Sequence, residues 1–126
     1  GLALLAAYTT TQTVRNARGE GTKRLFPYDL NAVHAAVLAA ARSRDLDVAE
    51  SDRKSGQYVL SSGISWRSFG ERIAVFVRTV SPRLTEVEVV SKPVLSPMNF
   101  PRDWELIVLD EIDAGLRGGA RGAVRP

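Results

Sequence analysis

Hydrophobic and polar positions change their spacing along this chain, and each spacing predicts a different element. Between residues 30 and 43 the apolar residues recur every three to four positions, which is typical of an amphipathic helix. They are Leu30, Val33, Val37, Leu38 and Ala41. Asp29 stands directly before this stripe, where a carboxylate can accept hydrogen bonds from the amides of the first turn. We therefore predict a helix over residues 30–43 with Asp29 as its cap.

After residue 45 the spacing falls to two, which is the period of a strand with one buried face. We predict four strands, over residues 46–50, 58–66, 72–80 and 84–91, separated by turn-forming residues. Ser61-Ser62-Gly63 predicts a bulge or kink inside the second strand. In the fourth strand Val87 and Val89 alternate with Glu86 and Glu88, so we expect buried valines and glutamates that face water. The pattern predicts an antiparallel meander.

A second helix is predicted near the C-terminus. Residues 92–100 contain Pro93 and Pro97 and are expected to form a loop, because proline cannot pair inside a sheet. The helix should begin at residues 99–101 and bury one apolar stripe. That stripe comprises Trp104, Val108, Leu109, Ile112 and Leu116, and the glycines expected to end the helix are Gly115, Gly118 and Gly119.

Neither helix can bury its stripe alone, so both are expected to lie on one face of the sheet. The predicted fold class is α+β: a two-layer sandwich with two helices on one face of a three- to four-stranded antiparallel sheet, in the order α-β-β-β-β-α. Trp104 and Phe76 are the large residues expected between the layers. This domain should span residues 26–116, after a signal remnant and flexible tether over 1–25 and before a disordered Gly/Arg tail over 117–126.

Composition agrees with a single domain of 126 residues, 44% of them hydrophobic and 25% charged. The chain has no cysteine, which excludes disulfides and thiolate chemistry, and its one histidine excludes a zinc site made of His and Cys. The net charge of +3 is uneven, because residues 1–24 and residues 117–126 each carry +3 and the segment between them carries −3. The predicted domain is therefore mildly acidic, which argues against a basic face for nucleic acid.

Candidate catalytic and metal-binding residues are few. We interpret His34 as a boundary residue of the first helix rather than an acid or base. Asp45, Asp47, Glu50 and Asp52 raise the alternative of a calcium site. Strand alternation should place the first two on one side and the last two on the other, so we favour a solvated strand and turn. The glycines form no phosphate loop or nucleophile elbow. We predict no catalytic residue, no metal site and no cofactor.

Partner-binding candidates come from two places. Asp110, Glu111 and Asp113 lie near the end of the second helix, where the helix dipole disfavours anions. We expect nearby arginines to neutralise them, and the alternative is that Asp110 and Glu111 bind a basic partner. The sheet is expected to leave one face and its edges open to a partner or a second copy. The candidates on that face are Tyr58, Trp66, Arg67 and Arg78.

The first residues pass from an apolar run, Leu2–Ala7, into a threonine-rich run at residues 9–13. This resembles the end of a bacterial lipoprotein signal, in which a Leu-Ala-Ala or Leu-Ala-Gly triplet precedes the lipidated cysteine. Tyr8 occupies the lipid-anchor position here and departs from that cysteine. The resemblance implies a periplasmic, outer-membrane-associated protein. The alternative is a frayed N-terminal helix or a tag-proximal segment.

A second resemblance covers about residues 26–116. The segments that carry it are Tyr28-Asp-Leu, Asp52-Arg-Lys-Ser-Gly56, Val87-Glu-Val89 and Asp103-Trp104. Their order resembles the helix-grip domains of small bacterial outer-membrane lipoproteins, the BamC-like domains. This resemblance implies a non-enzymatic structural or accessory subunit of an envelope assembly. Its implied partners are other envelope proteins, a second copy in a homo-oligomer, and the outer membrane if the chain is lipidated.

Three other functions stay open. Arg117-Gly118-Gly119 and Arg121-Gly122 are similar to the Arg-Gly-Gly segments of RNA-binding proteins, and the strand aromatics could stack bases. A nucleic-acid-binding module is therefore the alternative function, although this tail contains no aromatic residue and we expect no nucleic-acid partner. An enzyme with a carboxylate-only site is the second, and binding of a small hydrophobic ligand between helices and sheet is the third.

Overall fold

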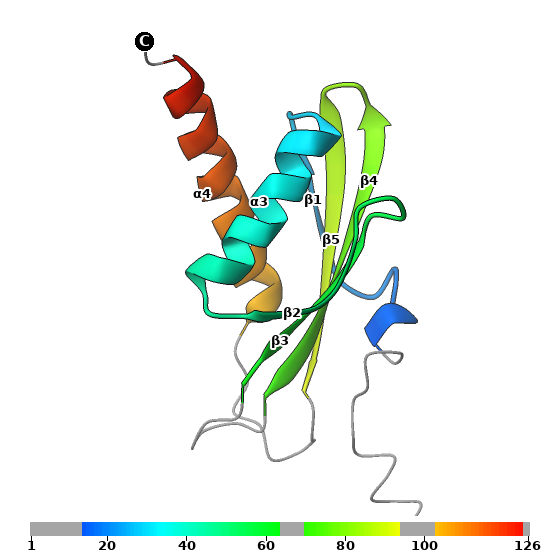
Figure 1. The fold of residues 1–126 in the computed structure, drawn as a ribbon. Coiled ribbons are helices and arrows are strands. Elements are labelled where there is room, and N and C mark those ends of the chain that lie inside the picture. Colours follow the sequence, from blue (N-terminus) through cyan, green and yellow to red (C-terminus); the bar gives the residue numbers. More distant parts are fainter. Residues whose placement is uncertain (1–13, 64–69, 94–102, 125–126) are drawn as a thin grey trace, which may run out of the picture.

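A computed structural model describes residues 14–63, 70–93 and 103–124 of the chain (Figure 1). In chain order the elements are β1 (Thr22–Phe26), α3 (Leu30–Ser43), β2 (Asp47–Asp52), β3 (Gln57–Ser62), β4 (Glu71–Ser81), β5 (Leu84–Pro93) and α4 (Trp104–Val124). No helix in these residues is long and apolar enough to cross a membrane.

The strands form one antiparallel sheet in the order β1-β5-β4-β3-β2. Both helices lie on one face of this sheet, as Figure 1 shows. The predicted α+β class is confirmed. The described sheet has five strands rather than three or four, because β1 was not predicted.

Helix α3 begins and ends by local chemistry. The Asp29 carboxylate accepts a hydrogen bond of 2.8 Å from the amide of Ala32, so the predicted cap is confirmed. At the other end Asp45 adopts a left-handed conformation, with a φ of 54°, and the chain turns into β2. The helix buries one stripe against the sheet. That stripe comprises Val33, His34, Ala36, Val37, Ala40 and Ala41.

The core lies between the helices and the sheet, and strand alternation decides which residues enter it. Strand β4 contributes Ile73, Val75 and Val77, and α4 contributes Trp104. Trp104 thus lies where it was predicted. Phe76 does not: it is one residue out of phase with Val75 and Val77, so it lies on the opposite face.

The predicted tether over residues 1–25 is wrong from residue 14 onward. Residues 22–26 form β1, which pairs with β5 along its whole length. Val14 and Ala17 are buried against the sheet. Backbone pairing and a small apolar contact therefore fix this polar segment, although it shows no hydrophobic period. Residues 1–13 lie outside the described residues.

The predicted tail over residues 117–126 is also wrong, because α4 continues to Val124. Glycine ends a helix only where the chain leaves in a left-handed conformation, and Gly115 and Gly118 stay helical here. An ion pair of 3.1 Å between Asp113 and Arg117, one turn apart, spans this region. The glycines therefore weaken the helix without ending it.

Three smaller predictions also need correction. The bulge expected at residues 61–63 is absent from the described part of β3, and bulges occur instead at Ala49 in β2 and near Val80 in β4. Strand β5 extends through Lys92 to Pro93, into the predicted loop. Helix α4 begins at Trp104 rather than at residues 99–101, and the Asp103 carboxylate accepts a hydrogen bond of 3.2 Å from the Leu106 amide. The other parts of that loop and the second half of the 58–66 strand lie outside the described residues.

Candidate interaction site

The sheet face opposite the helices, which we call the outer face, has a small apolar centre covered by the N-terminal segment. Residues Val59, Ala74, Phe76 and Val90 form this centre, and Val14 and Ala17 pack on it. All of them are buried. The guanidinium of Arg18 lies over the Phe76 ring, 4.5 Å from its centroid. Residues 14–21 therefore act as a strap across the outer face.

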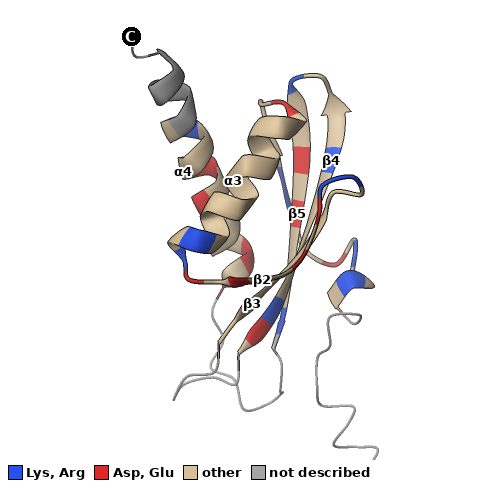
Figure 2. Ribbon diagram, in the orientation of Figure 1, with Lys and Arg blue, Asp and Glu red and all other residues tan. Residues whose placement is uncertain are grey.

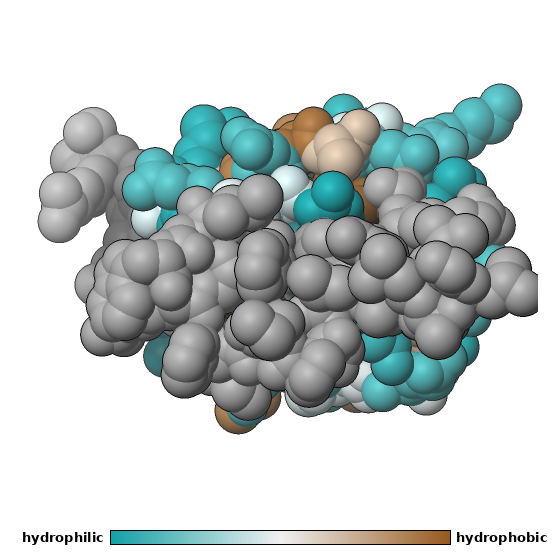
Figure 3. Space-filling view, turned by 90° about the horizontal axis from the view of Figure 1, so that it is seen from below, coloured by the Kyte–Doolittle hydropathy of each residue, from teal (hydrophilic) through white to brown (hydrophobic). Residues whose placement is uncertain are grey.

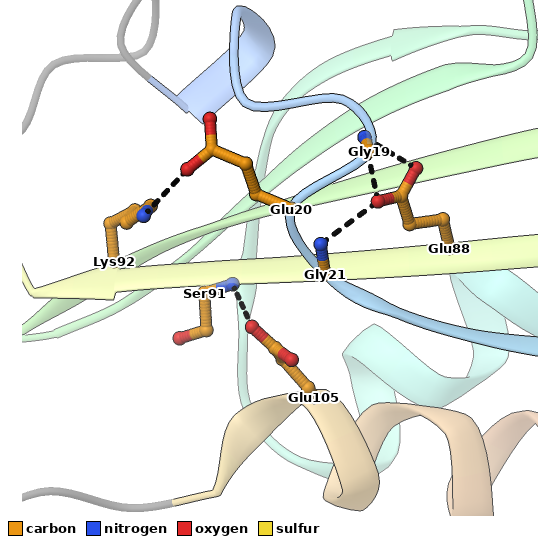
Figure 4. A network of polar contacts seen from close by, with 7 residues as sticks. All are labelled: Gly19, Glu20, Gly21, Glu88, Ser91, Lys92 and Glu105. Carbon is orange, nitrogen blue, oxygen red and sulfur yellow. Dashed lines mark hydrogen bonds and ion pairs between the residues drawn. The ribbon is translucent and has the colours of Figure 1, made fainter.

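A buried carboxylate holds the end of this strap (Figure 4). Glu88 of β5 is only 3% exposed. Its two oxygens accept hydrogen bonds of 3.0 and 2.8 Å from the amide of Gly19, and one also accepts a bond of 2.9 Å from the amide of Gly21. Backbone amides aimed at a carboxylate offset the loss of its hydration. The prediction that Glu88 faces water is therefore wrong.

Glycine is required at one point of the strap. A Cβ atom on Gly21 would clash with the carbonyl oxygen of Val89, because the two strands approach closely there. Gly19 has a φ of 94°, in the region that favours glycine. An ion pair of 3.2 Å between Glu20 and Lys92 lies beside this contact (Figure 4). The Gly-Glu-Gly triplet is thus the sequence signal for this anchor, although sequence alone does not say what it contacts.

The other face of β5 is tied to α4. The Glu105 carboxylate accepts a hydrogen bond of 3.1 Å from the Ser91 amide (Figure 4). It also accepts one of 2.7 Å from the Thr22 hydroxyl. Strand β5 therefore carries the strap on its outer face and the helix on its inner face. Movement of the strap would act directly on the strand that anchors α4.

The carboxylates of β2 lie together on the outer face. Ala49 is the extra residue of the bulge, because Val48 pairs with Leu60 while Glu50 pairs with Val59. The bulge reverses the alternation, so Asp47, Glu50 and Asp52 share one side. The prediction that Asp47 lies opposite the other two is therefore wrong. The described residues contain no cluster of three or more His, Cys, Asp or Glu that could hold a metal.

Strand β2 forms an open edge of the sheet. All six of its residues are exposed, and no other described strand pairs with its free side. Val48 is 42% exposed there. At the other edge, β1 exposes Lys23 and presents Leu25 with 54% of its surface accessible. These two edges are the parts of the described molecule best suited to strand addition.

His34 and Tyr58 form a buried polar pair between α3 and the sheet. His34 Nδ1 and the Tyr58 hydroxyl are hydrogen-bonded, and His34 Nε2 is buried without a partner in the described structure. Burial, and to a lesser degree the nearby charge of Arg53, lowers the pKa of His34. The interpretation of His34 as a boundary residue is wrong, because it is part of the buried core.

The structure places the predicted partner-binding residues of the sheet in different environments. Tyr58 is buried on the helix side of the sheet, so the prediction that it lies on an exposed face is wrong. Its register explains this, because it pairs with the core residue Val75. Arg78 is exposed on the outer face and forms an ion pair of 3.2 Å with Glu86. Trp66, Arg67 and Tyr8 lie outside the described residues.

The acidic residues of α4 are neutralised by arginines, as predicted. Asp110 pairs with Arg24 at 2.9 Å. Glu111 pairs with Arg44 at 3.0 Å and accepts a hydrogen bond from Ser43. The Ser43 and Arg44 contacts lower the pKa of Glu111. These contacts join α4 to β1 and to the end of α3. Partner binding by Asp110 and Glu111 stays a prediction.

Seen from below, the described residues at this end of the molecule are mostly hydrophilic, with a small hydrophobic group between them (Figure 3).

Comparison with known proteins adds no assignment: the chain matches no protein-family model, and no curated protein matches its sequence. Function must therefore be argued from the strap, the edges and the buried pair.

Proposed function

We propose that this chain is a non-enzymatic structural or accessory subunit of a bacterial envelope assembly and acts by binding other proteins. The observation that carries the proposal is the open edge at β2, where six consecutive residues are exposed and one side of the backbone is unpaired among the described strands. An exposed edge offers a row of amides and carbonyls to an added strand, and the neighbouring side chains set its specificity.

The envelope part of this proposal rests on the resemblance of Leu2–Ala7 to the end of a lipoprotein signal. The strap fixes residues 14–21 on the outer face, so this apolar run is separated in sequence from a folded point by only a few residues. A membrane anchor in that run would hold the domain near the bilayer surface. The edges would then be presented to partners in the same compartment.

Two cross-linking positions test the interaction. Val48 and Leu106 have nearly the same exposed fraction, 42% and 43%. Val48 lies on the edge strand β2, whereas Leu106 lies on helix α4. We would insert a photo-reactive residue at each position, express the full chain in its native host, and compare the adducts by mass spectrometry. Defined protein adducts at position 48 that are absent at position 106 are the expected result. Equal or absent adducts at both positions would contradict an edge-binding function.

The compartment needs its own measurement. Intact mass and membrane fractionation of the same preparation would report any processing near Tyr8 and any lipid. Recovery in the envelope fraction is expected. A chain found unmodified in the cytosol would contradict the envelope assignment, whereas the cross-linking result would still decide whether β2 binds a partner.

A further inference from the structure

The two edge strands carry opposite charge. Strand β1 contains Lys23 and Arg24, whereas β2 contains Asp47, Glu50 and Asp52 (Figure 2). Ion pairs inside the chain reduce this difference without removing it. Arg24 contacts Asp110, and Glu50 contacts Arg15 at 3.5 Å. Lys23 and Asp47 form no ion pair among the described residues.

The two edges also run in the same direction. Each neighbouring pair in the sheet is antiparallel, and the sheet has an odd number of strands, so β1 and β2 are parallel to each other. A second copy displaced sideways in the plane of the sheet would place its β1 beside β2 in parallel register. The helices of both copies would then lie on the same face.

The widths of the two layers allow this displacement. Five strands span about 24 Å across a sheet. Two helices packed side by side span about 20 Å. Neighbouring copies could therefore continue the sheet while leaving room for the helices of each copy.

The charges of the edge strands favour a contact of β2 with β1 of the next copy over a symmetric contact between two identical edges. A symmetric contact of β2 with β2 would oppose carboxylates to carboxylates, and a contact of β1 with β1 would oppose cations to cations. A contact of β2 with β1 brings opposite charges together on the outer face, where Lys23 and the β2 carboxylates all lie. It would also cover Leu25 and Val48, the exposed apolar side chains of the two edges.

From these features we infer that copies of this chain associate head to tail, with β2 of one copy adding to β1 of the next. The inference rests on the proposed function, since it names a second copy as the occupant of the edge. The contact is heterologous, so it continues into an open chain or a closed ring of copies rather than pairing two copies by a two-fold axis.

Charge exchange between the edges tests this directly. One variant, Lys23→Glu with Arg24→Glu, makes both edges acidic, and it also removes the ion pair of Arg24 with Asp110 of α4. The other, Asp47→Lys with Glu50→Lys, removes the acidic character of β2, and Asp52 is kept because it accepts hydrogen bonds from the turn amides of Lys54 and Ser55. A third variant, Arg42→Glu with Arg83→Glu, changes the net charge as the first does at two exposed positions that belong to neither β1 nor β2.

Sedimentation of the full chain at up to about 1 mM should give a mass above that of the monomer at low salt. That mass should fall to the monomer value in about 0.5 M NaCl, because salt screens exposed charges. Each edge variant alone should be monomeric, the Arg42/Arg83 variant should behave as wild type, and an equimolar mixture of the two edge variants should recover the wild-type mass. Circular dichroism of each variant checks that it is folded.

Two outcomes would overturn the inference. One is a mixture of folded edge variants that stays monomeric, and the other is a wild-type chain that is monomeric at every concentration and salt. If cross-links at position 48 then lead to a different protein, the edge-binding function stands and only the self-association is lost. If the chain stays monomeric and position 48 gives no specific cross-link, both the edge-binding function and the self-association are contradicted.

Discussion

Protonation of His34 should lower the stability of the folded protein. It is buried, it shares a hydrogen bond with Tyr58, and its Nε2 has no partner in the described structure. Protonation would place an additional charge at that nitrogen, within the field of Arg53. Burial and this charge explain why the pKa of His34 is lowered.

The free energy of unfolding should therefore fall as pH falls. In the unfolded chain the pKa of histidine is about 6.5. Because its pKa is lower in the folded state, the unfolded state binds more protons between these two values, and acid favours unfolding there. Urea denaturation between about pH 8 and about pH 5 should show a larger loss in wild type than in His34→Gln. Equal losses would contradict this account. Hydrogen bonds from Ser55 and from Ser43 also lower the pKa of Asp52 and of Glu111, respectively, but these two carboxyl groups contribute alike to both proteins.

Gly21 and Gly118 offer a matched pair of substitutions. A methyl group on Gly21 would clash with the Val89 carbonyl, whereas nothing lies within 4 Å of a Cβ on Gly118 in α4. Gly21→Ala should lower the free energy of unfolding by about 1–3 kcal/mol. Gly118→Ala should raise it by about 0.5–1 kcal/mol, because alanine favours helix. Thermal or urea denaturation measures both, and opposite signs are the expected result.

At the scale of elements, the sequence predicted the strands and helices whose core-facing side is apolar, and it missed β1, whose core-facing side has one apolar residue, Phe26. The alternating apolar residues of β4 and β5 and the apolar stripe of α3 are the residues that form the core. In β1 only Phe26 enters the core: Thr22 and Arg24 on the same side contact Glu105 and Asp110 of α4, whereas the apolar Leu25 on the opposite side is exposed. A hydrophobic period cannot predict such a strand.

The strap was missed for a related reason. Glu88 alternates with valines and therefore has the pattern of a solvent-facing residue, but amides from a segment almost seventy positions away bury it. The Gly-Glu-Gly triplet marks a tight backbone at residues 19–21, but no local pattern says that Glu88 is the group it contacts. The sequence predicted that the sheet has open edges, but it did not predict which strands form them. That depends on the strand order, which places β1 and β2 at the two edges.

Glu88 should control whether the strap stays on the sheet. Glu88→Gln removes the charge and gives the side chain only one acceptor oxygen for the Gly19 and Gly21 amides. We expect faster hydrogen exchange at these amides and faster tryptic cleavage at Arg15 and Arg18, both exposed on the strap.

Glu86→Gln is the control for that experiment. Glu86 lies two residues earlier on the same face of β5, where it pairs with Arg78 and makes no described contact with the strap. Its exchange and cleavage rates should match wild type. Equal rates in both variants would mean that Val14 and Ala17 hold the strap without help from Glu88.

At the scale of the whole molecule, the strap sets where the domain begins. Deletion of residues 1–13 should leave the fold and its stability unchanged, because Val14 is the first described residue that packs on the apolar centre of the outer face. Deletion of residues 1–21 would expose Val59, Ala74, Phe76 and Val90 and remove the partners of the Glu88 carboxylate. We expect it to lower the free energy of unfolding by about 3 kcal/mol or more.

The two deletions distinguish an integral strap from a tether, because they differ by only eight residues. Urea denaturation gives the stability of each, and sedimentation shows whether the longer deletion associates through the uncovered face. If both truncated chains unfold at the wild-type urea concentration, residues 14–21 contribute nothing to the domain and the tether interpretation is restored. If only the longer deletion is destabilised, any anchor at the N-terminus is coupled to β5, and through Glu105 to α4, by a folded segment rather than by a flexible one.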